Sequence, residues 1–117
     1  MTNVSFGIKG ENYASKYLQN NGFKILQRNF RCRFGEADII ALDKQVLVFV
    51  EVKTAKIGSA VKPVDEMTAN KLAYLKRVID YYLILNKTTR EVRIDFVGLT
   101  VNQDENRVVE IDYRKNI

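Results

Sequence analysis

The sequence of 117 residues contains no histidine, no tryptophan, one cysteine and one proline. The lack of histidine excludes Ser-His-Asp and Cys-His catalysis, and with one cysteine it also excludes a zinc site built from cysteine and histidine. Acid–base chemistry must therefore come from carboxylates, lysines or tyrosines. Because Cys32 has no partner for an internal disulfide, the composition is typical of a reducing compartment.

Long apolar runs are also missing from the chain. None reaches the length of a membrane span, and the first residues lack the basic-then-apolar pattern of a signal peptide. We therefore expect a cytoplasmic protein with no membrane partner. The length predicts one domain over residues 1–117, enough for a genuine core but not for two domains.

Two neighbouring runs of strand-forming residues, 35–42 and 47–53, are the most informative part of the sequence. Both runs are apolar, yet they carry Glu36, Asp38, Glu51 and Lys53 where a core strand should tolerate no charge. A buried charge costs several kcal/mol unless it is paired or bound to a metal. These charges therefore indicate chemistry, or an unusual set of ion pairs.

The spacing of the two runs predicts how these charges are arranged. Residues 43–45 supply the only plausible turn, so the runs form a tight antiparallel hairpin. Counting back from the turn places Asp38 opposite Glu51 and Glu36 opposite Lys53, all on one face. A slip of one residue would separate Asp38 from Glu51, so the prediction depends on the register.

The residue types on this face favour a hard divalent cation. Asp38 and Glu51 would repel each other unless a cation lay between them, and Mg²⁺ or Mn²⁺ takes oxygen ligands of this kind. The ammonium of Lys53 would then stand beside the ion, able to stabilise a phosphate or position a water molecule. The alternative is a set of ordinary salt bridges at the end of a hairpin.

Basic residues lie on both sides of the acidic hairpin, in a chain of net charge +5. They include Arg28, Arg31 and Arg33 before it, and Lys56 and Lys71 after it. Such flanks would hold the backbone phosphates of a nucleic acid while the acids hold a metal ion. The alternative is that each cluster is a solvated loop or helix face.

The rest of the chain predicts a scaffold of helices and strands. Apolar spacing indicates a helix from Val4 to Asn21 that contains Glu11, and a second long helix capped by Asp65 or Thr68. The order α-β-β-β-α-β-β predicts an α/β fold in which helices flank one mixed five-stranded sheet. The remaining strands are expected over residues 23–29, 91–101 and 107–113.

Beyond the charged hairpin at Gly35–Ala41 and Val48–Thr54, the sequence has further characteristic blocks at Gly7–Glu11, Arg28–Arg31 and Ile94–Val97. Together these blocks resemble the YraN-like family of small bacterial proteins. That family is similar to the PD-(D/E)xK nuclease superfamily, which includes restriction endonucleases and archaeal Holliday-junction resolvases. The resemblance spans nearly the whole chain, and its central block is more specific than a Glu-x-Lys triplet alone.

The resemblance implies a restriction endonuclease-like fold and a metal-dependent endonuclease acting on DNA, including branched recombination or repair intermediates. It assigns Asp38 and Glu51 as metal ligands, Lys53 as the catalytic lysine and Glu11 as the acidic residue of the first helix. By similarity, the main-chain carbonyl of Val52 would complete the coordination of Mg²⁺ or Mn²⁺. Symmetric cleavage of a junction would require a homodimer with two-fold symmetry.

The sequence departs from the superfamily pattern in two places. Ala37-Asp38 replaces the usual Pro-Asp pair, and the segment Thr68–Lys71 keeps the family's Thr and Lys but loses its Arg. Glu36 and Asp95 match family positions without an assigned role, and salt bridges to Lys53 and Arg93 would explain them. The alternative function is a nucleic-acid-binding module that keeps the nuclease fold with little or no catalysis.

Overall fold

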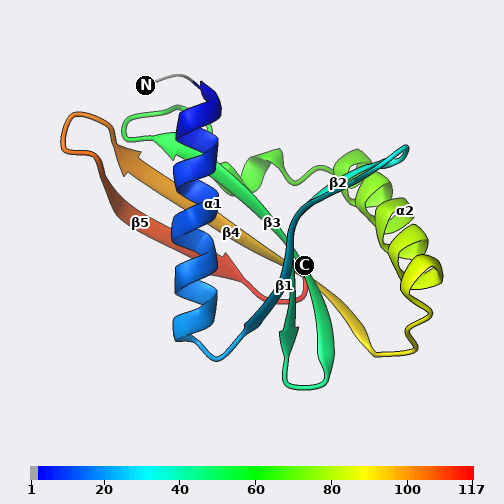
Figure 1. Ribbon diagram of the computed structural model, residues 1–117. Coiled ribbons are helices and arrows are strands. Elements are labelled where there is room, and N and C mark those ends of the chain that lie inside the picture. Colours follow the sequence, from blue (N-terminus) through cyan, green and yellow to red (C-terminus); the bar gives the residue numbers. More distant parts are fainter. Residues whose placement is uncertain (1–2) are drawn as a thin grey trace.

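Residues 3–117, which the computed structural model describes, form helices and strands in the order predicted from the sequence (Figure 1). A short 3-10 helix, η1, adds one element that was not predicted from the sequence. The elements are α1 (Asn3–Asn20), β1 (Lys24–Cys32), β2 (Gly35–Asp43), β3 (Val46–Lys56), η1 (Pro63–Glu66), α2 (Ala69–Asn86), β4 (Val92–Asn102) and β5 (Arg107–Arg114).

The strands of the described chain form one mixed sheet in the order β1-β2-β3-β4-β5. Strands β1, β2 and β3 form an antiparallel meander, and β4 and β5 form an antiparallel pair. The central pair β3 and β4 is parallel, so the chain must cross over between them, and α2 lies in that connection. The predicted α/β sheet with flanking helices is confirmed.

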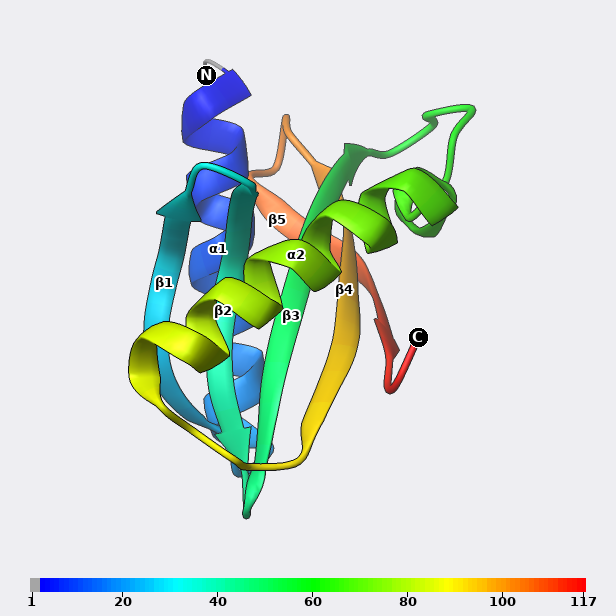
Figure 2. The same cartoon turned by 90° about the vertical axis from the view of Figure 1, so that its right-hand side faces the viewer.

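Apolar side chains pack against both faces of the sheet. Under α1 lies a cluster that includes Leu18, Val50 and Val97, and under α2 lies a second cluster that includes Phe49 and Val78. Figure 2 shows α2 crossing one face of the sheet while α1 lies behind it. Burying each such side chain contributes about 1.5–3 kcal/mol, so the two clusters hold the three layers together.

The ends of both helices follow the sequence signals. Gly22, at φ +90°, lets the chain turn out of α1, as a glycine at that position predicts. The hydroxyl of Thr68 accepts a hydrogen bond of 3.2 Å from the Lys71 N–H and caps α2, whereas Asp65 belongs to η1. Among the helices that the structure describes, none is long and apolar enough to cross a bilayer.

Helix α1 approaches strand β3 most closely at Gly10. A methyl group built on Gly10 would collide with the side chain of Thr54, whereas one built on Gly7 would meet nothing within 4 Å. Glu11 follows Gly10 directly, so this close contact fixes the distance between the Glu11 backbone and the sheet. Close packing of α1 on the sheet therefore requires a glycine at position 10 and not at position 7.

Candidate functional site

The hairpin of β2 and β3 has the register predicted from the sequence near its turn. The paired residues run from Asp43 with Val46 to Ile39 with Val50. The ladder ends at this pair, so the predicted pairing of Asp38 with Glu51 is wrong. Where the strands part, the Val52 N–H donates instead to Asp38 Oδ2 at 2.8 Å. The Asp38 carboxylate thus satisfies a main-chain donor that would otherwise be unpaired and buried.

The early end of the ladder also changes the partner of Glu36. The predicted pairing with Lys53 is wrong, because Glu36 lies opposite Arg31 of β1 and forms an ion pair with it at 2.9 Å. Both side chains are largely exposed, so this ion pair contributes little to stability. Lys53 is left available to the buried acids.

The four predicted residues nevertheless share one face and line one cavity, whose volume is about 200 Å³. Helix α2 and the turn between β1 and β2 form its other walls. The residues that line it are Phe34, Gly35, Glu36, Asp38, Glu51, Lys53, Lys71, Tyr74, Leu75 and Val78.

The two acids at the floor of this cavity are buried. Asp38 is 6% exposed and Glu51 is 8% exposed. The pKa of the Glu51 carboxyl is raised to about 9. Burial is the largest cause, and the hydrogen bond and negative charge of the adjacent Asp38 also raise it. The nearby ammonium of Lys53 opposes this shift without cancelling it. Without a metal ion, Glu51 therefore carries a proton at neutral pH.

Two lysines from different elements face these acids. Burial lowers the pKa of Lys53, but its hydrogen bond with Lys71 and the charges of Glu51 and Asp38 raise it above the usual value. The same contact with Lys53, followed by burial, lowers the pKa of Lys71. Lys71 therefore belongs to the acidic site itself, whereas Lys56 is exposed at the end of β3 and does not line the cavity.

Glu11 approaches the acidic pair from the helix on the other face of the sheet. Burial raises its pKa, and the charge of Asp38 is the second cause, so the two carboxylates lie within electrostatic reach. Arg28 Nη2 holds Glu11 Oε1 at 3.6 Å. Glu11 does not line the cavity, but of the two buried acids it is Asp38 whose charge acts on Glu11.

The donor set fits a hard divalent cation held by few protein ligands. Within residues 3–117, no group of three or more histidine, cysteine or acidic side chains forms a complete metal cluster. Two carboxylates are enough for Mg²⁺, which commonly keeps several waters and takes one or two carboxylates. A cation at Asp38 and Glu51 would also remove the repulsion that favours the proton on Glu51. The carbonyl of Val52 stays a predicted further ligand.

The predicted phosphate-contact arginines follow β1 to its turn. Arg31 and Arg33 are exposed near the tip, and the Arg33 guanidinium lies 4.8 Å from the centre of the Phe34 ring. Arg28 lies further back and is the ion-pair partner of Glu11. The structure therefore places Arg31 and Arg33 beside the cavity mouth, and gives Arg28 a contact that positions an acid.

Asp95 lies on the α1 face of the sheet, away from the acidic cavity. It is fully buried and accepts hydrogen bonds from Arg93, from the Tyr113 hydroxyl and from the Asn116 N–H. Burial alone would raise the pKa of Asp95, but these donors hold it below its usual value. Arg93 also bonds Asp43 at 2.9 Å. The salt bridge that the sequence offered as an explanation is confirmed, and Asp95 is a structural residue.

Sequence reasoning missed one wall of the cavity. Tyr74 is 59% exposed and lines the cavity together with Lys71, which lies one turn before it on α2. The signal was present, because residues three apart on a helix share a face, so assigning Lys71 to the site also places Tyr74 there.

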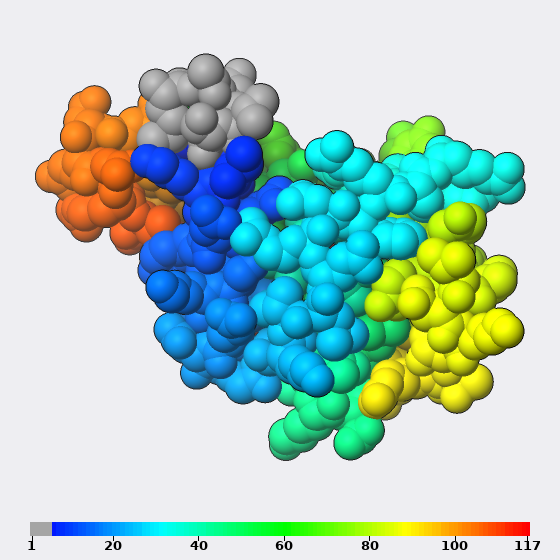
Figure 3. Space-filling model, in the orientation of Figure 1, coloured from blue at the N-terminus to red at the C-terminus, as the bar shows by residue number. Residues whose placement is uncertain are grey.

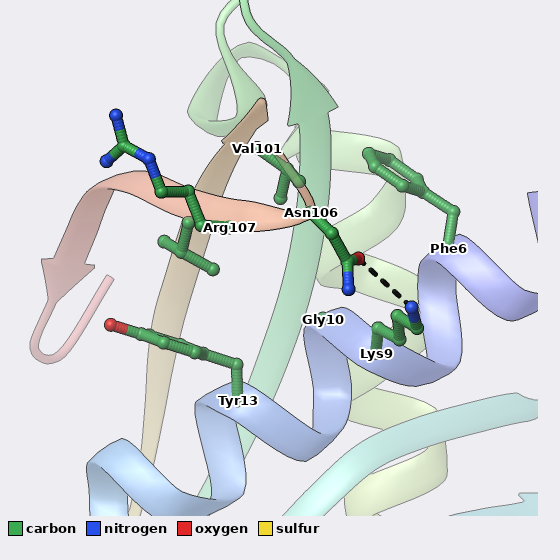
Figure 4. A pocket seen from close by; sticks show the side chains of 8 residues that line it. Phe6, Lys9, Gly10, Tyr13, Val101, Asn106 and Arg107 are labelled. Atoms are coloured by element: carbon green, nitrogen blue, oxygen red, sulfur yellow. Dashed lines mark hydrogen bonds between the residues drawn. The ribbon is translucent and has the colours of Figure 1, made fainter. Parts of the chain in front are cut away.

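A larger hollow of about 390 Å³ lies elsewhere, between α1 and the turn that joins β4 to β5 (Figure 4). Lys9 Nζ donates to Asn106 Oδ1 at 3.0 Å across it. Its lining includes Phe6, Tyr13 and Val101 and no acidic residue. The smaller cavity is the candidate site because its acids Asp38 and Glu51 are buried.

Comparison with known proteins supports one family. The sequence model of the family described as "Uncharacterised protein family UPF0102" matches residues 10–99, which include Glu11, Asp38, Glu51 and Lys53. A UPF0102 protein of Caldicellulosiruptor saccharolyticus is 38% identical over 117 residues, covering 99% of this chain and 98% of the relative. UPF0102 proteins of Thermotoga maritima and Chlorobium chlorochromatii are 39% and 41% identical, covering 79% and 82% of this chain and 83% and 74% of those relatives. The chain therefore belongs to the uncharacterised protein family UPF0102.

Proposed function

We propose that this protein is a metal-dependent endonuclease that hydrolyses phosphodiester bonds in DNA. The observation that carries the proposal is the buried pair Asp38 and Glu51, with Lys53 beside it, at the point where β2 and β3 part. The Lys53 ammonium offsets only part of the cost of burying two adjacent acids, so a bound cation or a proton on Glu51 is still needed there. Mg²⁺ or Mn²⁺ suits oxygen ligands of this kind.

The size of the cavity favours a polymer over a small molecule as the substrate. Its volume is about 200 Å³. Sites that enclose a drug-sized ligand usually measure roughly 300–1,000 Å³. A phosphodiester group can enter such a cavity while the rest of a strand lies on the surface, where the exposed Arg31 and Arg33 would contact neighbouring phosphates.

Each residue of the site has a defined chemical task in this proposal. Asp38, Glu51 and the Val52 carbonyl would hold the cation, and Glu11 would add negative charge behind Asp38. A divalent cation, when bound, supplies Lewis-acid chemistry and lowers the pKa of water. The Lys53 ammonium orients the attacking water or stabilises the charge that develops on the phosphate oxygens.

The test compares wild-type protein with Lys53→Ala and with the control Lys16→Ala, an exposed lysine of α1. We expect Lys53→Ala to abolish cleavage of DNA in Mg²⁺ or Mn²⁺ while DNA affinity stays within a few-fold, because Lys53 acts on the reacting group. Lys16→Ala should cleave as the wild type does. Equal cleavage by Lys53→Ala would contradict the proposal.

Asp38→Asn is a second informative variant because it preserves structure. The asparagine side-chain oxygen can still accept the Val52 N–H, so the fold where β2 and β3 part should survive. The variant loses the charge that a cation needs. We therefore expect folded protein without metal-dependent cleavage.

The second candidate is a nucleic-acid-binding module without catalysis. The lack of a three-carboxylate cluster among the described residues favours it. A site with only two buried carboxylates could keep a proton on Glu51 and bind no metal ion. This candidate predicts salt-dependent DNA binding that needs no metal and that Asp38→Asn leaves unchanged or tightens through lost repulsion. Metal-dependent cleavage that is lost in Lys53→Ala would exclude it.

A further inference from the structure

We infer that the substrate of this site is a DNA strand with unpaired nucleotides, one of whose bases stacks on Tyr74 beside the scissile phosphate. The inference rests on the proposed function and adds the structural class of the substrate. Its basis is the aromatic rim of the acidic cavity, where Tyr74 of α2 and Phe34 of the β1–β2 turn both line the opening.

Tyr74 is placed to receive a flat ligand. More than half of the residue is exposed, although it lies directly beside buried acids and lysines. Arg77, one turn further along α2, has its guanidinium 5.9 Å from the centre of the Tyr74 ring. An aromatic ring next to a guanidinium is the combination that receives unstacked bases in proteins that bind single strands.

The opposite rim is also aromatic, but it is fixed by packing. The Phe34 ring lies 6.1 Å from the ring of Tyr81 and below the guanidinium of Arg33. Tyr81 also contacts Phe30, so the hairpin tip is anchored to α2. Figure 3 shows the cyan tip of the β1–β2 hairpin against the yellow residues of α2. The two rims therefore flank one opening, in which the Phe34 ring is packed and the Tyr74 ring is exposed.

This geometry favours unpaired nucleotides over an intact duplex. In a duplex the bases are stacked on each other and unavailable to a protein ring, so Tyr74 would gain nothing from them. An unpaired base can turn out of the strand, and its phosphate can then enter the cavity toward Asp38 and Glu51. A single exposed tyrosine is common on protein surfaces, and its position on the rim of the acidic cavity sets Tyr74 apart.

The experiment measures affinity in Ca²⁺, which takes the same oxygen ligands, for two DNA probes of identical sequence around a 2-aminopurine base. One probe is a full duplex, and in the other the reporter base lies in an unpaired arm. The variants are Tyr74→Ala, Tyr74→Phe and Tyr13→Ala, the last an exposed tyrosine on α1. Circular dichroism and thermal unfolding show whether each variant is folded.

We expect the wild type to bind the arm more tightly than the duplex and to quench its fluorescence by stacking. Tyr74→Ala should lose about tenfold in affinity for the arm, together with the quenching, and little for the duplex. Tyr74→Phe keeps an aromatic ring and should bind as the wild type does, as should Tyr13→Ala. If Tyr74→Ala fails to fold, Tyr74→Leu tests the same loss of stacking.

Different failures separate this inference from the proposed function. Equal binding of arm and duplex, or an equal loss on both in Tyr74→Ala, overturns the inference while metal-dependent cleavage can still stand. A wild-type protein that neither binds DNA in Ca²⁺ nor cleaves either probe in Mg²⁺ or Mn²⁺ overturns both.

Discussion

Replacing Glu51 by glutamine should stabilise the metal-free protein at neutral and alkaline pH. The residue is only 8% exposed, and burial together with Asp38 raises its pKa from 4.5 to about 9. Between those values, the folded protein keeps a proton on Glu51 that the unfolded chain has released. Glutamine has nearly the same shape and no proton to lose, so it removes this dependence on pH.

The sign and size of the effect follow from proton linkage. Because the folded state binds one proton more than the unfolded state, the free energy of unfolding falls as pH rises through this window. One proton corresponds to about 1.4 kcal/mol per pH unit, or about 2.7 kcal/mol between pH 6 and pH 8 as an upper limit. The contribution of Glu51 is thus full below its unfolded pKa and is lost as pH rises through the folded value.

The assay is urea unfolding of the wild type and Glu51→Gln at several pH values, with metal removed by a chelator. We expect the wild type to lose stability between pH 6 and pH 8 relative to Glu51→Gln, whereas Glu110→Gln, an exposed control, should follow the wild type. Parallel profiles for the wild type and Glu51→Gln would refute the argument that this carboxyl holds a proton.

Adding Mn²⁺ extends the same measurement to the metal site. A cation that binds only the folded state stabilises it, and it must displace the proton from Glu51. The stabilisation by Mn²⁺ should therefore be larger at pH 8 than at pH 6, and it should be small in Glu51→Gln. Equal stabilisation of the two proteins would mean that the ion binds elsewhere.

Two further predictions concern the scaffold. Gly10→Ala should destabilise the protein by about 1–3 kcal/mol in urea unfolding, because its methyl group collides with Thr54. The control Gly7→Ala, in the same helix, should be neutral or stabilising by up to about 1 kcal/mol. Equal effects of the two substitutions would contradict the contact. Asp95→Asn should cost about 1.5–3 kcal/mol at neutral pH, because the Arg93 guanidinium loses one of its two carboxylate partners and keeps only Asp43. Because folding lowers the pKa of Asp95, its carboxylate stabilises the fold at pH values above the pKa of the unfolded chain, and this stability is lost as pH falls through the pKa of the folded state. The wild type should therefore lose more stability in acid than the variant does. Matching acid profiles would argue against this role.

The sequence predicted the acidic half of the site because that half depends on local rules. Period-two alternation and a tight turn place Asp38, Glu51 and Lys53 on one face, and the cavity contains all three. The same rules overextended the ladder, because local pairing says nothing about where two strands part. That point depends on sheet twist and on the hydrogen bond from Val52 to Asp38.

Contacts between elements were harder to foresee from the sequence. Lys71 was predicted as a phosphate contact, and its contact with Lys53 could not be predicted because it depends on the path of α2 over the sheet. Glu11 reached the acidic pair only through the family resemblance, because a single helix pattern does not reveal what lies across the sheet. Asp95 had a partner nearby in sequence, Arg93, and its salt bridge could be offered from the sequence for that reason.

The parallel pairing of β3 with β4 also determines the order in which the site can assemble. Asp38, Glu51 and Lys53 lie within one hairpin, so a short loop closure brings them together early in folding. Lys71 and Tyr74 arrive later, because α2 docks only when the long connection from β3 to β4 closes. A chain caught between these steps has the acids without the second lysine and the aromatic rim. Complete assembly of the site therefore requires this long-range step as well as the local hairpin.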